Sequence, residues 1–154
     1  MTIIYSLIAL AIILADQLVK LWTVNNTALG EVFGKIPFIA DFMYVQNTGA
    51  AFSILSGKVE ILGVISVLFC IGVVVYWLIK KPGHPLLCTS VTMMFAGALG
   101  NAIDRIFRGF VVDYISLAFM DFPVFNIADI AITVGAVLLV VFVMFFDKGK
   151  TENE

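Results

Sequence analysis

The sequence predicts an all-α membrane protein with four transmembrane helices and a small extracytoplasmic β-type cradle in the first loop. The chain is 62% hydrophobic and 13% charged, with a mean hydropathy of +1.09, whereas soluble domains are about half apolar and about a quarter charged. Four windows also approach the roughly 20 apolar residues that a membrane-spanning helix needs. These windows lie at about residues 3–24, 61–79, 86–103 and 127–146.

Residues 1–147 are therefore expected to form a single membrane domain, and residues 148–154 a polar cytoplasmic tail. The formal net charge of -2 and the isoelectric point near 5.3 exclude a strongly basic surface for nucleic acid. The single histidine, His84, has no second histidine or cysteine cluster beside it, which argues against a zinc site. Cys70 and Cys88 stand in apolar stretches and are interpreted as small buried side chains.

The first window contains two charged residues, Asp16 and Lys20, at a spacing of four. It lacks a basic start and a small-residue cleavage site followed by a soluble domain, so we interpret it as a retained span rather than a signal peptide. At this spacing the two side chains can pair on one helix face. Two interpretations stay open, a pair that neutralises itself or a pair that supports a functional site.

The long first loop, residues 25–60, is rich in aromatic and branched residues. Its stretch "KIPFIADFMYVQNTGAAFSIL" favours strands, followed by a turn at Asn47, after which Gly49, Ala50 and Ala51 leave room for close backbone or ligand approach. It is either a small sheet packed on the helix ends or a platform at the lipid headgroups for a lipid-bearing partner. Composition does not separate the two.

The second window, 61–79, is uninterrupted and ends at Lys80 and Lys81, and the third carries polar residues at its far end. In "AGALGNAIDR" the small residues permit close helix contact in lipid. Asn101, Asp104 and Arg105 follow at spacings that place them on one helix face. A buried amide such as that of Asn101 needs a partner.

The fourth window opens with Asp129, just after Asn126. An acidic residue in the first turn of a helix complements the helix dipole and caps free N–H groups, so Asp129 alone favours a capping role. Asp113, in "GFVVDYI", is a carboxylate in an apolar segment without that explanation. With four spans, the first and third loops lie on the same side of the membrane, which makes a pair of Asp113 and Asp129 plausible.

Two carboxylates held close together tend to share one proton. One can act as general base on a water molecule while the other, protonated, polarises a scissile carbonyl. This is aspartic protease chemistry, and it needs no metal and no nucleophilic serine or cysteine.

Loop charge leaves the orientation undecided, because four basic residues flank the spans on each side. The residues on the side of the termini are Lys80, Lys81, Lys148 and Lys150; those on the other side are Lys35, Lys58, Arg105 and Arg108. The tight pair in a very short loop favours cytoplasmic termini.

Five stretches, in this order, resemble the lipoprotein signal peptidase (signal peptidase II) family, the four-span bacterial aspartyl enzymes. They are "ADQLVK" at 15–20, "QNTGAAFS" at 46–53, "FAGALGNAIDR" at 95–105, "VVDYI" at 111–115 and "FNIAD" at 125–129. Each stretch alone is weak, but together they cover essentially the whole chain apart from the tail. Two departures are Gln46, where a basic residue is common, and the short segment between the two aspartates.

The resemblance implies an endopeptidase that cuts prolipoproteins before a diacylglyceryl-modified cysteine, in the bacterial plasma membrane, with cytoplasmic termini and an outward-facing site. It implies that Asp113 and Asp129 are catalytic and that the first loop holds a small interfacial helix. The residues implied to line the substrate site are Asn47, Asn101, Arg105 and Asn126; those with a supporting role are Asp16, Lys20 and Asp104. No cofactor or metal is expected, and the protein is expected to act as a monomer.

Three alternatives were compared with this interpretation. The GxGD motif of another intramembrane aspartyl protease class is absent, and so is the DG…AR…G…D…D pattern of CDP-alcohol phosphotransferases. The remaining alternative is a small non-enzymatic membrane transporter or assembly subunit whose buried charges line a path.

Overall fold

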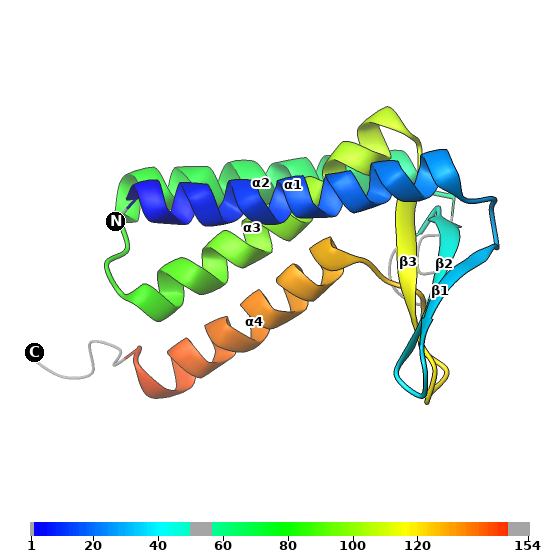
Figure 1. Ribbon diagram of the computed structural model, residues 1–154. Helices are drawn as coiled ribbons and strands as arrows, with labels where there is room; N and C mark the ends of the chain where they lie inside the picture. The colour runs from blue at the N-terminus through cyan, green and yellow to red at the C-terminus, as the bar shows by residue number, and fades with distance from the viewer. Residues whose placement is uncertain (1, 50–56, 148–154) are drawn as a thin grey trace, which may run out of the picture.

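The computed structural model describes residues 2–49 and 57–147, in which four long helices form a bundle with a three-stranded sheet across one end (Figure 1). The helices are α1 (Thr2–Asn26), α2 (Val59–Lys80), α3 (Pro85–Phe107) and α4 (Ile127–Phe145). All four are long and apolar enough to cross a membrane, so the four predicted spans are confirmed. The predicted polar tail and the open space at Ala50 and Ala51 lie outside the described residues. So do residues 50–56 of the first loop, in which an interfacial helix was expected.

Three of the four helices, α1, α2 and α3, extend beyond their apolar windows, most clearly at the end of α3. The third window ends at residue 103, but α3 continues to Phe107, and Gly109 then takes a left-handed φ of 74°. Asp104 and Arg105 therefore belong to the last turns of a helix and not to the following loop. The predicted window is shorter than the helix because an apolar window ends at its first charged residue. The helix itself ends only where the backbone leaves the helical conformation.

The sheet joins the two loops that the sequence places on the same side. Strands β1 (Val32–Ile36), β2 (Ala40–Asn47) and β3 (Val111–Leu117) are antiparallel in the order β1-β2-β3. The expectation of a cradle in the first loop is correct for β1 and β2 but incomplete, because β3 comes from the third loop. In the β2–β3 register, Val45 lies opposite Asp113 and Asn47 opposite Val111. This pairing places Asp113 on the outer strand β3, opposite the end of β2 that leads to Asn47.

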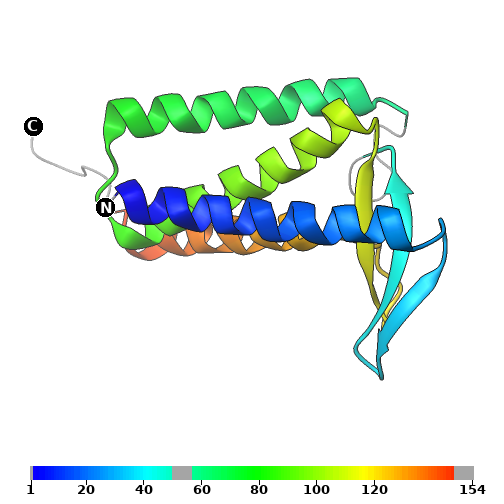
Figure 2. The ribbon, with the colours of Figure 1, turned by 45° about the horizontal axis from the view of Figure 1, so that its top comes forward.

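Helix α3 is the centre of the bundle and packs against the other three helices. Figure 2 shows α3 running between α2 on one side and α1 with α4 on the other. The contact with α4 is close because glycines stand where a side chain would not fit: a Cβ on Gly135 would lie 2.7 Å from Met94 Cγ, and one on Gly97 would meet the Ala128 carbonyl. The small residues predicted to allow close helix contact have this role here.

The helices differ in length, and this difference affects where the sheet meets the bundle. At a rise of about 1.5 Å per residue, the 25 residues of α1 and the 19 of α4 correspond to about 37 Å and about 28 Å. The start of α1 and the last turn of α4 both lie at the end of the bundle away from the sheet (Figure 1). The first turn of α4 lies farther from the sheet than the last turn of α1 does. Residues 118–126 bridge β3 to that recessed start.

Candidate active site

Asp113 and Asp129 come together at the junction of β3 with the start of α4, and one side chain connects them. Asn126 Nδ2 donates to Asp113 Oδ1 at 2.6 Å. Asn126 Oδ1 in turn accepts a hydrogen bond from the backbone N–H of Asp129 at 2.9 Å. Asn126 is fully buried, so its amide is held by these contacts rather than by water. The two aspartates proposed from sequence therefore share one hydrogen-bonded site.

Asp129 caps its helix and faces the site at the same time. Its Oδ2 accepts from the backbone N–H of Asn126 at 3.2 Å, which completes a capping box at the start of α4. Its Oδ1 accepts from Asn101 Nδ2 at 2.7 Å. The capping interpretation of Asp129 is thus confirmed, and it does not exclude a place in the site. In both hydrogen bonds a carboxylate oxygen of Asp129 is the acceptor.

Asp113 is almost completely buried, with 1% of its surface exposed. Burial, and secondly the nearby charge of Asp129, raise the pKa of Asp113 from 3.8 to about 7. Asn47 Nδ2 donates to Asp113 Oδ2 at 2.9 Å, which together with Asn126 opposes this rise only in part. Near neutral pH, Asp113 therefore carries the proton in a large fraction of molecules while Asp129 is held as a hydrogen-bond acceptor.

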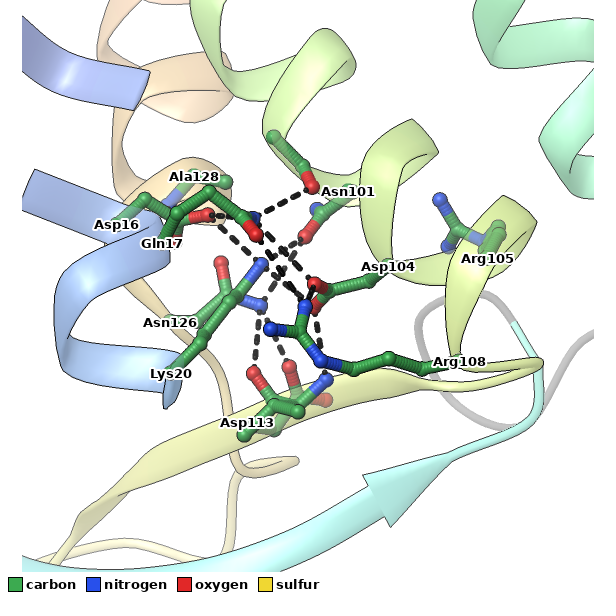
Figure 3. A network of polar contacts seen from close by, with 12 residues as sticks. Asp16, Gln17, Lys20, Asn101, Asp104, Arg105, Arg108, Asp113, Asn126 and Ala128 are labelled. Atoms are coloured by element: carbon green, nitrogen blue, oxygen red, sulfur yellow. Dashed lines mark hydrogen bonds and ion pairs between the residues drawn. The ribbon is translucent and has the colours of Figure 1, made fainter. Parts of the chain in front are cut away.

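Lys20 lies beneath this pair with no exposed surface. Its Nζ is 2.9 Å from Asp16 Oδ2 and 3.0 Å from Asp104 Oδ2 (Figure 3). It also donates to Asn101 Oδ1 at 2.9 Å. The interpretation of Asp16 and Lys20 as a pair that only neutralises itself is therefore wrong, because the ammonium connects α1 to two side chains of α3.

The two carboxylates beside Lys20 also fix backbone groups around the site. Asp16 Oδ1 accepts from the N–H of Ala128 at 3.1 Å, in the first turn of α4. Asp104 Oδ2 accepts from the N–H of Val112 at 3.1 Å, next to Asp113. The three supporting residues thus hold α1, α3, β3 and α4 in one arrangement.

Sequence reasoning did not identify Gln17, Arg108 or Tyr114, and all three belong to this network. Gln17 Nε2 donates to the Gly100 carbonyl at 3.0 Å, and its Oε1 accepts from Arg108 at 3.2 Å. Arg108 also forms an ion pair with Asp104 (Figure 3). Tyr114 Oη accepts from the N–H of Ile127 at 3.2 Å, and burial raises the pKa of this phenol. The spacing of four between Asp104 and Arg108 was the available signal for Arg108.

A cavity of about 450 Å³ opens beside the pair. Its polar lining is Asn47, Asn101, Arg105, Asp129 and Thr133. The rest of the lining is apolar, mostly from α4 and from residues 122–125. Arg105 Nη2 lies 3.4 Å from the Gly49 carbonyl, and its buried Nε has no partner among the described residues. This cavity can hold a mainly apolar chain with a few hydrogen-bonding groups.

Within residues 2–49 and 57–147, no three His, Cys, Asp or Glu side chains converge as a metal site would require. Cys70 and Cys88 are free and buried, as interpreted from sequence. The ring of His84 packs against Phe142 and Phe146, with centroids 4.9 Å and 5.0 Å away.

Both the sequence and the overall fold are similar to those of known proteins. The family model described as signal peptidase (SPase) II matches residues 8–145. A lipoprotein signal peptidase of Bacillus velezensis is 43% identical over 155 residues, covering 97% of this chain and 99% of the relative. One from Lactobacillus johnsonii is 39% identical over 145 residues, covering 94% of each chain. A solved structure of a bacterial membrane enzyme superposes with a TM-score of 0.87 at 32% identity, covering 97% of this chain and 94% of that one.

Proposed function

The chain belongs to the signal peptidase II family and removes signal peptides from prolipoproteins, and we propose that it does so as an aspartyl endopeptidase. Asp113 and Asp129 are the catalytic residues in this proposal. The observation that carries it is the amide of Asn126, which bonds to the Asp113 side chain and to the backbone of Asp129, a residue that lines the cavity. Family membership does not favour the alternative of a non-enzymatic transporter or assembly subunit.

The proposed reaction uses the different surroundings of the two aspartates. Asp129, ionised, takes a proton from a water molecule that attacks the scissile carbonyl carbon. Asp113, protonated, donates to the carbonyl oxygen as the tetrahedral intermediate forms. When the carbon–nitrogen bond breaks, the proton on Asp129 passes to the leaving amine, and Asp113 recovers its own proton. The pKa of Asp113 near 7 and the donors around Asp129 support this division of roles.

We assign substrate binding to Asn47, Asn101, Arg105 and Asn126. The first three line the cavity, where amide and guanidinium groups suit the backbone of an extended peptide. Cleavage before a diacylglyceryl-modified cysteine is the proposed specificity. The apolar lining from Phe122, Phe125 and Ile132 supports it, because acyl chains and an apolar signal peptide would both contact such a wall.

The proposed orientation places both termini in the cytoplasm of a bacterium and the site at the outer face of its plasma membrane. The site and the sheet lie at the opposite end of the bundle from the start of α1 and the end of α4, which supports this topology (Figure 1). We propose that the enzyme acts as a monomer, because all the residues assigned here belong to one chain.

The test is a gel-shift assay with a diacylglyceryl prolipoprotein in vesicles. Asp113→Asn and Asp129→Asn, made separately, are each expected to abolish cleavage while the protein stays folded in membranes. Asp121→Asn is the matched control, because Asp121 is an exposed aspartate in the same connecting segment. Wild-type cleavage by either catalytic variant would overturn the assignment, and loss of activity on adding a chelator would point to metal chemistry instead.

A further inference from the structure

A group of large apolar side chains lies exposed at the far end of the sheet. This sheet tip consists of Ile36, Phe38, Ile39, Phe119 and Met120. Two segments far apart in sequence form it, and the N–H of Ala118 donates to the Ile39 carbonyl at 3.0 Å to join them. Phe38 is 90% exposed. Clusters of this kind on a protein surface indicate a contact with another molecule or with a membrane.

The turn at the tip contains a residue that turn geometry does not favour. The N–H of Ile39 donates to the Ile36 carbonyl at 3.0 Å, with Pro37 and Phe38 between them. Phe38 has a φ of 64°, the third-position conformation of a type II turn, which favours glycine. A bulky aromatic residue is strained there. Neither turn formation nor exposure to water explains a phenylalanine at this position.

The tip lies at the end of the bundle where α1 and α3 end and α2 begins (Figure 1). Figures 1 and 2 both show the strands running across the helix axes, with the β1–β2 turn projecting sideways past the bundle. The strands thus run along the membrane surface. The end of α3 beside this level also exposes Ile106 and Phe107, so the apolar surface of the helices continues to the level of the sheet.

Charge is distributed around the tip as expected for a group at a lipid interface. Residues 36–40 and 117–120 carry no charge, and charged side chains follow immediately behind. Lys35 and Asp41 form an exposed ion pair at 3.6 Å, and Asp121 is exposed. Segments that lie at a lipid interface place their apolar groups at the acyl boundary and their charged groups among the headgroups. With two acidic groups and one basic group, this surface suits zwitterionic lipid better than anionic lipid.

We propose that the sheet tip inserts into the interfacial layer of the bilayer and anchors the sheet to zwitterionic lipid, separately from the four helices. Phe38 is the deepest group of this anchor. The inference concerns how the sheet is held and does not depend on the catalytic assignment. There are two alternatives: the tip contacts a second copy of the chain, or it is exposed to water.

Nitroxide labels read the depth of the tip directly. Phe38→Cys and Phe119→Cys are labelled in a Cys70→Ala/Cys88→Ala background, in phosphatidylcholine vesicles. We expect both labels to collide more with oxygen than with a water-soluble nickel chelate. Glu31→Cys, in the exposed loop before β1 and away from the tip, is the matched control and is expected to show the reverse.

Equal chelate accessibility at positions 38, 119 and 31 overturns the proposal in favour of water. Dipolar broadening at position 38 that disappears on dilution with unlabelled protein overturns it in favour of a second copy. If the cysteine-free background does not fold, Phe38→Trp in the native background replaces the labels. Lipids brominated near the headgroup are then expected to quench more fluorescence than in the parent protein, and unchanged quenching would contradict insertion.

Discussion

Lys20 Nζ lies 2.9 Å from Asn101 Oδ1, and this contact, with a second donor to the same oxygen from Asn126 Nδ2 at 3.2 Å, orients the Asn101 amide toward Asp129. An ammonium can only donate hydrogen bonds, so it takes the amide oxygen. The amide nitrogen is left to donate to Asp129 Oδ1 at 2.7 Å. A residue of α1 therefore orients a group of α3 toward a carboxylate of α4.

We predict that Lys20→Met lowers both stability and cleavage. Asp16 and Asp104 would lose a buried partner, which is expected to reduce the free energy of unfolding by about 3–5 kcal/mol. A misoriented Asn101 is expected to lower the cleavage rate on the order of 100-fold. Thermal unfolding in detergent and a vesicle cleavage assay measure the two effects.

The double variant Lys20→Met/Asp104→Asn separates them. It restores the charge balance, so stability should partly recover. Asn101 Oδ1 still lacks the charged donor and keeps only the weaker contact from Asn126 Nδ2, so cleavage should not recover. Recovery of both would mean that Lys20 acts only through charge.

We predict that cleavage slows as the pH rises past about 7. The proposed mechanism needs Asp113 protonated, and the pKa of this residue is raised to about 7 by burial and by Asp129. Above that value the protonated fraction falls about tenfold for each pH unit. The measurement is a pH profile of the single-turnover cleavage rate, and a rate that rises steadily from pH 6 to pH 9 would contradict the role given to Asp113.

The same proton makes stability depend on pH with a definite sign. Between 3.8 and about 7 the folded state keeps a proton on Asp113 that the unfolded state has released, so stability falls as the pH rises through this interval. Integrated over about three units, this contribution is about 4 kcal/mol. Asp113→Asn is expected to remove it, which denaturant unfolding of both proteins at pH 4.5 and pH 7.5 tests.

We predict that Asn126 has two functions that different substitutions separate. Asn126→Ala removes the cap of α4 and is expected to cost about 1–2 kcal/mol of stability as well as activity. Asn126→Ser keeps a capping oxygen but is too short to reach Asp113 Oδ1. Serine should therefore retain most of the melting temperature and lose most of the cleavage rate. If serine restores cleavage, the link to Asp113 is not needed.

We predict that Gly97→Ala separates α3 from α4. The new Cβ would meet the Ala128 carbonyl and lie 2.7 Å from Ile132 Cγ1, so the cost is expected to be about 1–3 kcal/mol. Gly72→Ala is the control, because a Cβ on Gly72, in α2, meets no atom within 4 Å. That control is expected to be neutral or stabilising by up to about 1 kcal/mol. Equal melting temperatures for both variants in detergent would contradict the close contact.

The sequence predicted the spans because an apolar run of sufficient length has few alternatives. It also placed Asp113 and Asp129 on the same side, because four crossings put the first and third loops together. It did not predict β3, because the apolar pattern of "VVDYI" is compatible with either a loop or a strand as long as its pairing with β2 is unknown. Strand pairing between Val45 and Asp113 depends on contacts 68 residues apart, and no local pattern encodes such a pairing.

The polar residues that were hardest to predict are those that hydrogen-bond to other polar groups of the network and lie outside the cavity. Gln17 stood beside Asp16 in a quoted motif, yet an amide on a helix surface carries no signal of its own. Its contacts with Gly100 and Arg108 depend on how α1 meets α3. Asp129 shows the opposite case, because its helix-capping role was readable from sequence while its contact with Asn101 was not.

The short, recessed α4 has a consequence for the membrane around it. At about 28 Å, α4 is slightly shorter than a hydrocarbon core of about 30 Å, whereas α1 exceeds it. Hydrophobic mismatch should therefore thin the lipid locally on the α4 side, which brings water down to Asp129. We expect cleavage to slow in vesicles of progressively longer acyl chains, with a smaller effect on unfolding. A rate independent of chain length would show that the hydrolytic water reaches Asp129 without any deformation of the bilayer.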